Sequence, residues 1–350
     1  MRYFNYNFIV DTHVTNILKE KYPVPQPLEW TEISSDILWV RLPLPMSLDH
    51  INVYLVKDSG GWALIDTGLY TDATINCWTA ILDKLDGPLT KVIATHMHPD
   101  HIGCLGYLTE LFHIPLYMSQ TDYFASRALY NGSQGACIWG DQQYYSRAGF
   151  SSEQVDKFTQ SSNGFKSVVS PIPLNFIRLK GGETLLIGTN DWLLMEGNGH
   201  SPEHISLYCK ELDMLISGDH VLPEITPNIG SYSTQPESNP LAAYLESLVP
   251  FCHLSEETIV LPSHRHPFLN PRKRVEEIIS HHQKHLTDLI EASRQGITIK
   301  EALPLLFKRN LDGQGMFFAV AEAYAHLNYL MYTKKIIRIL RNDVYIYQAV

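Results

Sequence analysis

The stretch that decides the fold is IATHMHPDHIGCLG, residues 93–106. It follows an apolar, strand-like run and precedes glycines, and it holds three histidines and an aspartate within six positions. On extended backbone, side chains two residues apart point to the same side, so His96 and His98 could share one metal ion. Asp100 and His101 follow at a helix start and could bind a second ion, about 3.5–4 Å from the first, with a bridging hydroxide between them. Taken alone, the stretch could also be a solvated, histidine-rich helix N-terminus.

Three further ligand candidates favour the metal site. His200 lies in GNGHSPEH, Asp219 in ISGDH and His264 in LPSHRHPF. Each follows an apolar, strand-like run and sits beside small residues that let the backbone approach closely. An isolated histidine is more often a structural or surface residue than a ligand. Four loops of this kind in one chain predict a single metal centre.

The remaining pattern predicts an α/β protein. Three strand-like runs, ILWVRLPL, INVYLVK and WALIDTG, form a meander, and residues 71–85 space their apolar residues as a helix does. The strand KVIATH then delivers the histidine motif at its end, where α/β proteins place their chemistry. Strands are predicted again within residues 175–188, 191–200, 204–220 and 258–268, with a helix at 240–251.

These motifs, in this order, resemble the metallo-β-lactamase-fold hydrolase superfamily. The resemblance covers residues 35–270 and rests on ALIDTG with Asp66, THMHPDHIG, GHSPEH, SGDH and LPSH. It implies a four-layer αβ/βα sandwich with the site at one edge of the two sheets. A histidine at position 98 departs from the flavo-diiron branch, and His264 favours a two-metal site over the mononuclear iron branch.

The resemblance also implies a role for each site residue. The implied first-metal ligands are His96, His98 and His200, and the implied second-metal ligands are Asp100, His101 and His264. Asp219 resembles the carboxylate that bridges both ions, and Asp66 resembles an aspartate that orients the ligands through hydrogen bonds. Zinc is the default for this donor set, although manganese or iron would also fit. Asp100 is the expected catalytic residue, which orients the hydroxide and passes a proton to the leaving group.

Two interpretations stay open for several other histidines and aromatic residues. His204, His220 and His266 adjoin ligand positions, and either substrate contact or capping of loop backbone explains them. Residues 119–170 are aromatic and rich in Gln and Ser, and we interpret them as a helical lid inserted between strands. Tyr144, Tyr145 and Trp139 in this lid could line an acyl pocket or simply pack it.

Residues 271–350 change to a helical pattern and end in two strand-like runs, which predicts a winged-helix-like C-terminal domain. This tail resembles that of the subgroup with glyoxalase II-like and β-lactamase-like protein 2-like members. His281, His282 and His285 on its first helix are expected on a solvated or interdomain face rather than in another metal site. Residues 1–34 are interpreted as an N-terminal extension.

Composition narrows the classes of partner. The net charge of −10 disfavours a general attraction to nucleic acid or anionic membranes. From residue 272 onward, however, 12 basic residues face 8 acidic ones. Five dispersed cysteines without a C-x-x-C pair argue against disulfides and a thiolate site. With no long apolar run and no secretory pattern at the N-terminus, we expect a cytoplasmic protein without a membrane partner, compatible with a homodimer.

The sequence therefore predicts a binuclear metal-dependent hydrolase that uses a bridging hydroxide on a thioester, ester or lactone of a small molecule. Two alternatives stay open. The first is a metal-dependent endoribonuclease whose C-terminal domain holds RNA. The second is a non-catalytic winged-helix binding or regulatory protein with a vestigial hydrolase fold, against which the complete ligand set counts.

Overall fold

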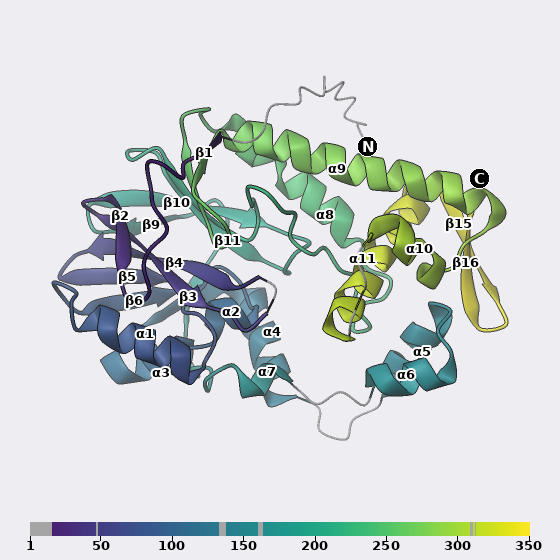
Figure 1. Ribbon diagram of the computed structural model, residues 1–350, viewed down its shortest axis with the longest axis horizontal. Coiled ribbons are helices and arrows are strands. Elements are labelled where there is room, and N and C mark those ends of the chain that lie inside the picture. Colours follow the sequence, from purple (N-terminus) through teal and green to yellow (C-terminus); the bar gives the residue numbers. More distant parts are fainter. Residues whose placement is uncertain (1–15, 47, 133–137, 160–163, 309–310, 312) are drawn as a thin grey trace.

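The computed structural model describes most of the chain, and Figure 1 shows its arrangement. The described residues are 16–46, 48–132, 138–159, 164–308, 311 and 313–350. The start of the predicted N-terminal extension and Cys137 lie outside them. The other four cysteines are free, and Cys104 and Cys209 among them are buried.

The first sheet has seven strands in the order β2-β3-β4-β5-β6-β7-β8. Their bounds are β2 Trp30–Ser34, β3 Ile37–Pro43, β4 His50–Asp58, β5 Gly61–Ile65, β6 Leu89–Ile93, β7 Leu116–Ser119 and β8 Ile177–Leu179. The predicted meander forms its antiparallel half, whereas β5 to β8 run parallel. The carboxyl ends of parallel strands meet at one edge of a sheet, so the histidine motif after β6 emerges at that edge.

The second sheet also has seven strands, in the order β1-β14-β13-β12-β11-β10-β9. Their bounds are β1 Asn16–Ile17, β9 Thr184–Ile187, β10 Asn190–Gly197, β11 His204–Cys209, β12 Met214–Gly218, β13 Ile259–Pro262 and β14 Phe268–Leu269. Only the β12–β13 pair within this described sheet is parallel. The other predicted ligands lie next to the ends of β10, β12 and β13.

Apolar side chains on both faces of each sheet account for the layers. Along β3, Trp39 faces the second sheet in one core cluster, whereas its neighbours Leu38 and Val40 face the outer helices in another. This alternation follows the two-residue period of a strand. The core between the sheets includes Trp192 and Leu207 of the second sheet. The predicted αβ/βα sandwich is confirmed.

Helices cover the outer faces of both sheets (Figure 1). The helices α1 Asp72–Leu82, α2 Pro99–Ile102 and α3 Leu105–Phe112 pack their apolar side chains into a core shared with the first sheet. The second sheet is covered by α8 Pro240–Ser247, the short 3-10 helix η1 Val249–His253 and the start of the long α9 Pro271–Ala292.

In its described residues, the region interpreted as a lid contains four helices, α4 Gln120–Asn131, α5 Trp139–Arg147, α6 Ser152–Thr159 and α7 Gly164–Ser167. Tyr144 and Tyr145 of α5 are buried in the core that α5 and α6 share with the C-terminal helices, whereas Trp139 is largely exposed. The two tyrosines therefore pack this region.

The C-terminal part consists of α9, η2 Ser293–Gln295, α10 Ile299–Leu306, α11 Gly313–Tyr332 and the antiparallel hairpin β15 Ile336–Arg341 and β16 Val344–Ala349. A capping box starts α10, because Thr298 and Glu301 each bond the other's backbone N–H. The predicted order of helices followed by a hairpin is present. A winged-helix arrangement stays a prediction.

Part of the predicted N-terminal extension belongs to the sandwich. β1 pairs with β14, and β2 pairs with β3 along Trp30 to Ser34. Both ends of this segment are thus tied into sheets. Within the described ranges, none of the helices combines the length and the apolar character needed to cross a bilayer.

Candidate metal centre

The centre forms where β5 and β6 end side by side. Asp66 follows β5 with a positive φ of 62°, and its N–H donates to the carbonyl of Ile93, the last residue of β6. Its carboxylate accepts the N–H of Thr95 at 2.8 Å. Pro99 then starts α2, where a missing N–H costs nothing. The chain between Thr95 and Pro99 is thereby folded into a short loop that presents the histidines.

One group of candidate ligands gathers His96, His98, His200 and Asp219, with one donor atom of each within 4.8 Å of the others. His96 Nε2 and His98 Nδ1 lie 2.8 Å apart. His200 Nε2 is 3.3 Å from Oδ2 of Asp219. These are four of the seven ligands predicted from the sequence.

A second group gathers Asp100, His101 and His264. His101 Nε2 and His264 Nε2 lie 3.6 and 3.5 Å from Oδ2 of Asp100. The same two nitrogens lie 3.5 and 3.4 Å from Oδ1 of Asp219. Asp219 therefore turns one oxygen toward each group, so this carboxylate could serve both of them.

The carboxylates make the second group favourable for positive charge. Burial alone would lower the pKa of His264, but Asp219 and Asp100 beside it raise that pKa to about 10. Burial would likewise raise the pKa of Asp100, but His101 and His264 lower it to about 2. In the first group, burial and the neighbouring His200 lower the pKa of His98 to about 3. The His98 ring is thus neutral, and a neutral imidazole has a lone pair that can bind a cation.

The donor set fits divalent metal ions. Among the described residues, buried side-chain atoms without a hydrogen-bond partner include His101 Nε2, His200 Nε2 and Asp219 Oδ1. Such atoms are costly in a folded protein unless something else binds them. All three point into the two groups, and imidazole nitrogen with carboxylate oxygen is the donor set that zinc and its neighbours prefer.

Strands of the first sheet hold the second group in place. Nδ1 of His101 lies 2.7 Å from Oδ2 of Asp66, which is the orienting contact that the sequence predicts for this aspartate. Nδ1 of His264 lies 2.9 Å from the carbonyl oxygen of His50 at the start of β4. Each contact holds Nδ1 and leaves Nε2 of the ring facing the centre. Metal-binding histidines are commonly oriented by such a partner on their other ring nitrogen.

His200 is held differently, because its Nδ1 lies 2.8 Å from the carbonyl oxygen of Asn228 in the long loop after β12. Neither Asn228 nor this contact was predicted. The only sequence signal is the position of the loop, which follows Asp219 directly.

Asp122 in the first turn of α4 is a second unpredicted residue. It is fully buried, and its carboxylate accepts the N–H of Met97 at 2.9 Å and the N–H of Glu203 at 2.6 Å. The carboxylate of Glu203 in turn accepts the N–H of Thr121, the residue before Asp122, at 2.7 Å. One carboxylate thus joins the loop of His96 and His98 to the loop of His200. An acidic residue just after β7, the neighbour of β6 in the sheet, was the available signal.

The histidines left undecided by the sequence have separate roles. Nε2 of His204 accepts the backbone N–H of Asp219 at 3.2 Å, so this ring supports the bridging candidate. His220 is buried against Tyr244 and bonds to Ser247, and His266 packs edge-on against Trp39. None of these three belongs to a described metal-like group.

The histidines of α9 also lie outside the described metal-like groups. His281 is exposed on this helix, whereas His282 is buried and its Nδ1 lies 3.1 Å from Nε2 of His326 in α11. His282 therefore sits at the contact between the two helices.

Two family models match the chain. The model of the Metallo-beta-lactamase superfamily matches residues 46–264, and that of the Metallo-beta-lactamase-like, C-terminal domain matches residues 286–350. The first match spans all seven candidate ligands and Asp66. The second covers most of the segment that the sequence predicts as a separate C-terminal domain.

Solved structures and curated relatives agree. A beta-lactamase domain protein from Burkholderia ambifaria has a TM-score of 0.87 and 32% identity, covering 95% of this chain and 99% of that one. TTHA1429 from Thermus thermophilus has a TM-score of 0.77 and 27% identity, over 91% and 100% of the two chains.

Among curated proteins, the probable metallo-hydrolase YqjP of Bacillus subtilis is 24% identical over 85% of this chain and 92% of its own. The acyl-coenzyme A thioesterase MBLAC2 of Gallus gallus is 27% identical over 55% and 67%. The chain therefore belongs to the metallo-β-lactamase superfamily and is a metal-dependent hydrolase.

Proposed function

We propose that the chain hydrolyses a thioester, ester or lactone of a small molecule at a centre that holds two divalent ions, with zinc as the first choice. The observation that carries the proposal is the placement of Asp219, whose two oxygens face the two ligand groups. A single ion would need only one of these groups.

The ions would supply a Lewis acid for the substrate carbonyl and would make a water molecule acidic enough to attack near neutral pH. The chain's own residues do the rest. Oδ2 of Asp100 lies 3.6 and 3.5 Å from Nε2 of His101 and His264, and this oxygen can accept a hydrogen bond or a proton. The side chain of Asp100 is about one-fifth exposed, more than those of Asp66 and Asp219, so it is the one of these three acids that a substrate can reach most easily. We assign the proton transfer to the leaving group to Asp100.

The thioester class is supported by a relative. MBLAC2 is named as an acyl-coenzyme A thioesterase, and its match to this chain covers about half of the chain. Thioesters and lactones pose the same chemical problem, which is attack on an acyl carbon with departure of a sulfur or oxygen anion.

A panel of substrates tests the proposal. Purified protein with two equivalents of Zn²⁺, Mn²⁺ or Fe²⁺ would be given acyl-CoA, acyl-glutathione, a lactone and single-stranded RNA, each with and without EDTA. We expect EDTA-sensitive release of a thiol or an acid. RNA cleavage without acyl hydrolysis would replace the proposal by the nuclease alternative. Saturation at one metal equivalent would contradict the two-ion centre.

A further inference from the structure

The loop from Asp219 to Asn228 links both halves of the candidate centre. At its start, the carboxylate of Asp219 faces the two ligand groups. At its end, the carbonyl of Asn228 contacts Nδ1 of His200 at 2.8 Å. Any shift of this loop would therefore move a ligand and the partner that orients another ligand.

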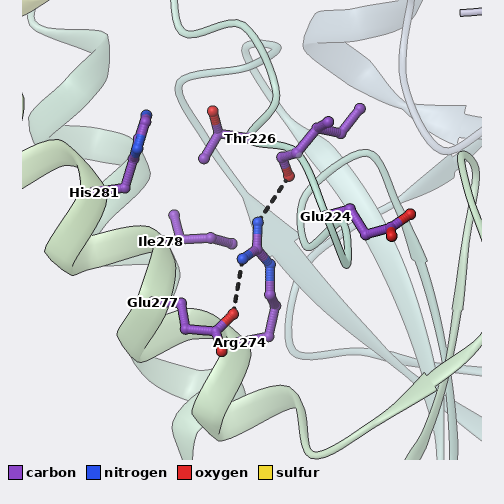
Figure 2. Close-up of a pocket in the computed structure, with 7 residues that line it drawn as sticks. Glu224, Thr226, Arg274, Glu277, Ile278 and His281 are labelled. Atoms are coloured by element: carbon purple, nitrogen blue, oxygen red, sulfur yellow. Dashed lines mark hydrogen bonds and ion pairs between the residues drawn. The ribbon is translucent and has the colours of Figure 1, made fainter. Parts of the chain in front are cut away.

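The long helix α9 holds the middle of this loop (Figure 2). The guanidinium of Arg274 donates to the carbonyls of Leu222 at 2.5 Å and Ile225 at 3.0 Å, and it pairs with Glu277 at 2.9 Å. Arg274 is 9% exposed, and such a buried charge is stable only when its donors are satisfied. A cavity of about 340 Å³ beside it is lined by residues of the loop and of α9.

Helix α11 holds the end of the loop. Oε2 of Glu322 accepts a bond from the side-chain amide of Asn228 at 2.8 Å, and the same amide also donates to the carbonyl of Phe318 at 3.3 Å. The hydroxyl of Tyr232 donates to Oδ1 of Asn228 at 2.8 Å. The Asn228 side chain is thus held on both sides while its backbone carbonyl faces His200. Glu322 is 8% exposed, so its carboxylate is committed to this contact.

We propose that the C-terminal helices act as a clamp on the metal centre, with Glu322 and Arg274 as positioning residues that set the orientation of His200 and Asp219. The inference rests on the proposed ligand set, because it requires His200 to bind a metal. Two buried side chains, a guanidinium and a carboxyl group from two helices of the C-terminal part, both bond to the ten-residue segment that starts at Asp219 and ends at Asn228. If these helices only covered the core, apolar contacts would suffice at these positions.

Glu322 gives a more specific test than Arg274, because its described link to the centre runs through the side chain of Asn228. Glu322→Ala removes the acceptor, Glu322→Gln keeps one, and Asn228→Ala removes the amide while leaving the backbone carbonyl at His200. Asn328→Ala is the matched control. Asn328 is a fully buried amide on the same helix that bonds to Ser231, Pro236 and Ser238 instead.

Zinc affinity measured by chelator competition, and the visible spectrum of the Co²⁺-substituted protein, report on ligand geometry without any substrate. We expect Glu322→Ala and Asn228→Ala each to weaken zinc binding about tenfold and to change the Co²⁺ bands, as orienting partners of ligands commonly do. The double variant should be no worse than Asn228→Ala alone, because Asn228→Ala already removes the contact that Glu322→Ala removes. Glu322→Gln should stay near the wild type. Arg274→Met should weaken binding in the same direction, although it also loosens α9.

Two results would overturn the clamp. The first is wild-type zinc affinity and wild-type Co²⁺ bands in folded Glu322→Ala. The second is an equal loss of affinity in Asn328→Ala, which would reduce the effect to general loosening of α11. Failure of the proposed function is distinguishable from both. In that case the wild-type protein itself would fail in one of two ways. If it bound fewer than two Zn²⁺ ions, the clamp would fail with the proposed function. If it bound two ions and hydrolysed no acyl substrate, the clamp would still stand.

Discussion

The two ligand groups are anchored in different parts of the molecule. His101 and His264 are oriented by Asp66 after β5 and by the backbone of His50 in β4, in the buried middle of the first sheet. His200 is oriented by Asn228, which depends on a helix of the C-terminal part, and its loop is tied through Asp122 to α4. The second group is therefore fixed by the sandwich itself. The first group also requires peripheral helices to dock.

This difference means that the two metal positions should respond differently to damage. A change in the middle of the first sheet should affect the second group and the stability of the sandwich together. A change in a peripheral helix should affect the first group while the sandwich stays folded. Four substitutions and one matched control test this contrast.

Asp219→Ala should have the largest effect, because it removes the one candidate ligand among the described residues that faces both groups. We expect turnover to fall by more than about a hundredfold, beyond the range usual for loss of an orienting partner. Metal content by elemental analysis should drop below two ions per chain, while circular dichroism confirms the fold. Retention of both ions at wild-type affinity would show that Asp219 is not shared.

Asp66→Asn tests the anchor in the sheet. The carboxylate accepts bonds from the N–H and the hydroxyl of Thr95 and contacts Nδ1 of His101, whereas an amide offers only one acceptor oxygen. We expect the zinc affinity of the second ligand group to fall about 10-fold to 100-fold. Stability should fall by about 1–3 kcal/mol, measured by chemical denaturation. If zinc binding at the first ligand group were weakened instead, the assignment of Asp66 to the second group would be wrong.

Asp122→Asn tests the anchor in the peripheral helix, with Asp58→Asn as its matched control. Asp58 is also a shielded carboxylate that joins separate segments, because it accepts the N–H of Gly188 and pairs with Lys91. Only Asp122 bonds to the two ligand loops.

Both substitutions should lower stability by about 1–3 kcal/mol. Only Asp122→Asn should lower the zinc affinity of the first ligand group, by about tenfold, as measured by the same chelator competition. Equal zinc affinities for the two variants would count against a peripheral anchor.

Thr298→Ala should have the smallest effect. It removes the capping box at the start of α10 and should cost about 1 kcal/mol of stability. Zinc affinity should not change, because neither partner of this cap contacts the loop from Asp219 to Asn228. A measurable loss of affinity would mean that general loosening of the C-terminal helices is enough to disturb His200.

Much of the fold could be predicted because strand and helix periods are local. The β3–β4–β5 meander, the strand before the histidine motif and the closing helices with their hairpin all follow from residues close in the chain. The lid region was harder to interpret. Its sequence does not say that Tyr144 packs against Tyr324 of α11, because that contact joins segments 180 residues apart.

The sequence by itself determined which side chains could bind a metal, because His and Asp beside strand-end glycines are visible as letters. All seven candidates lie within the two groups. Only the tertiary structure decided what orients them. The carbonyl of Asn228 and the N–H groups of Met97 and Glu203 are backbone atoms that every residue type carries. Which helix brings Asp122 or Glu322 to them depends on how distant segments dock, and no local pattern records that.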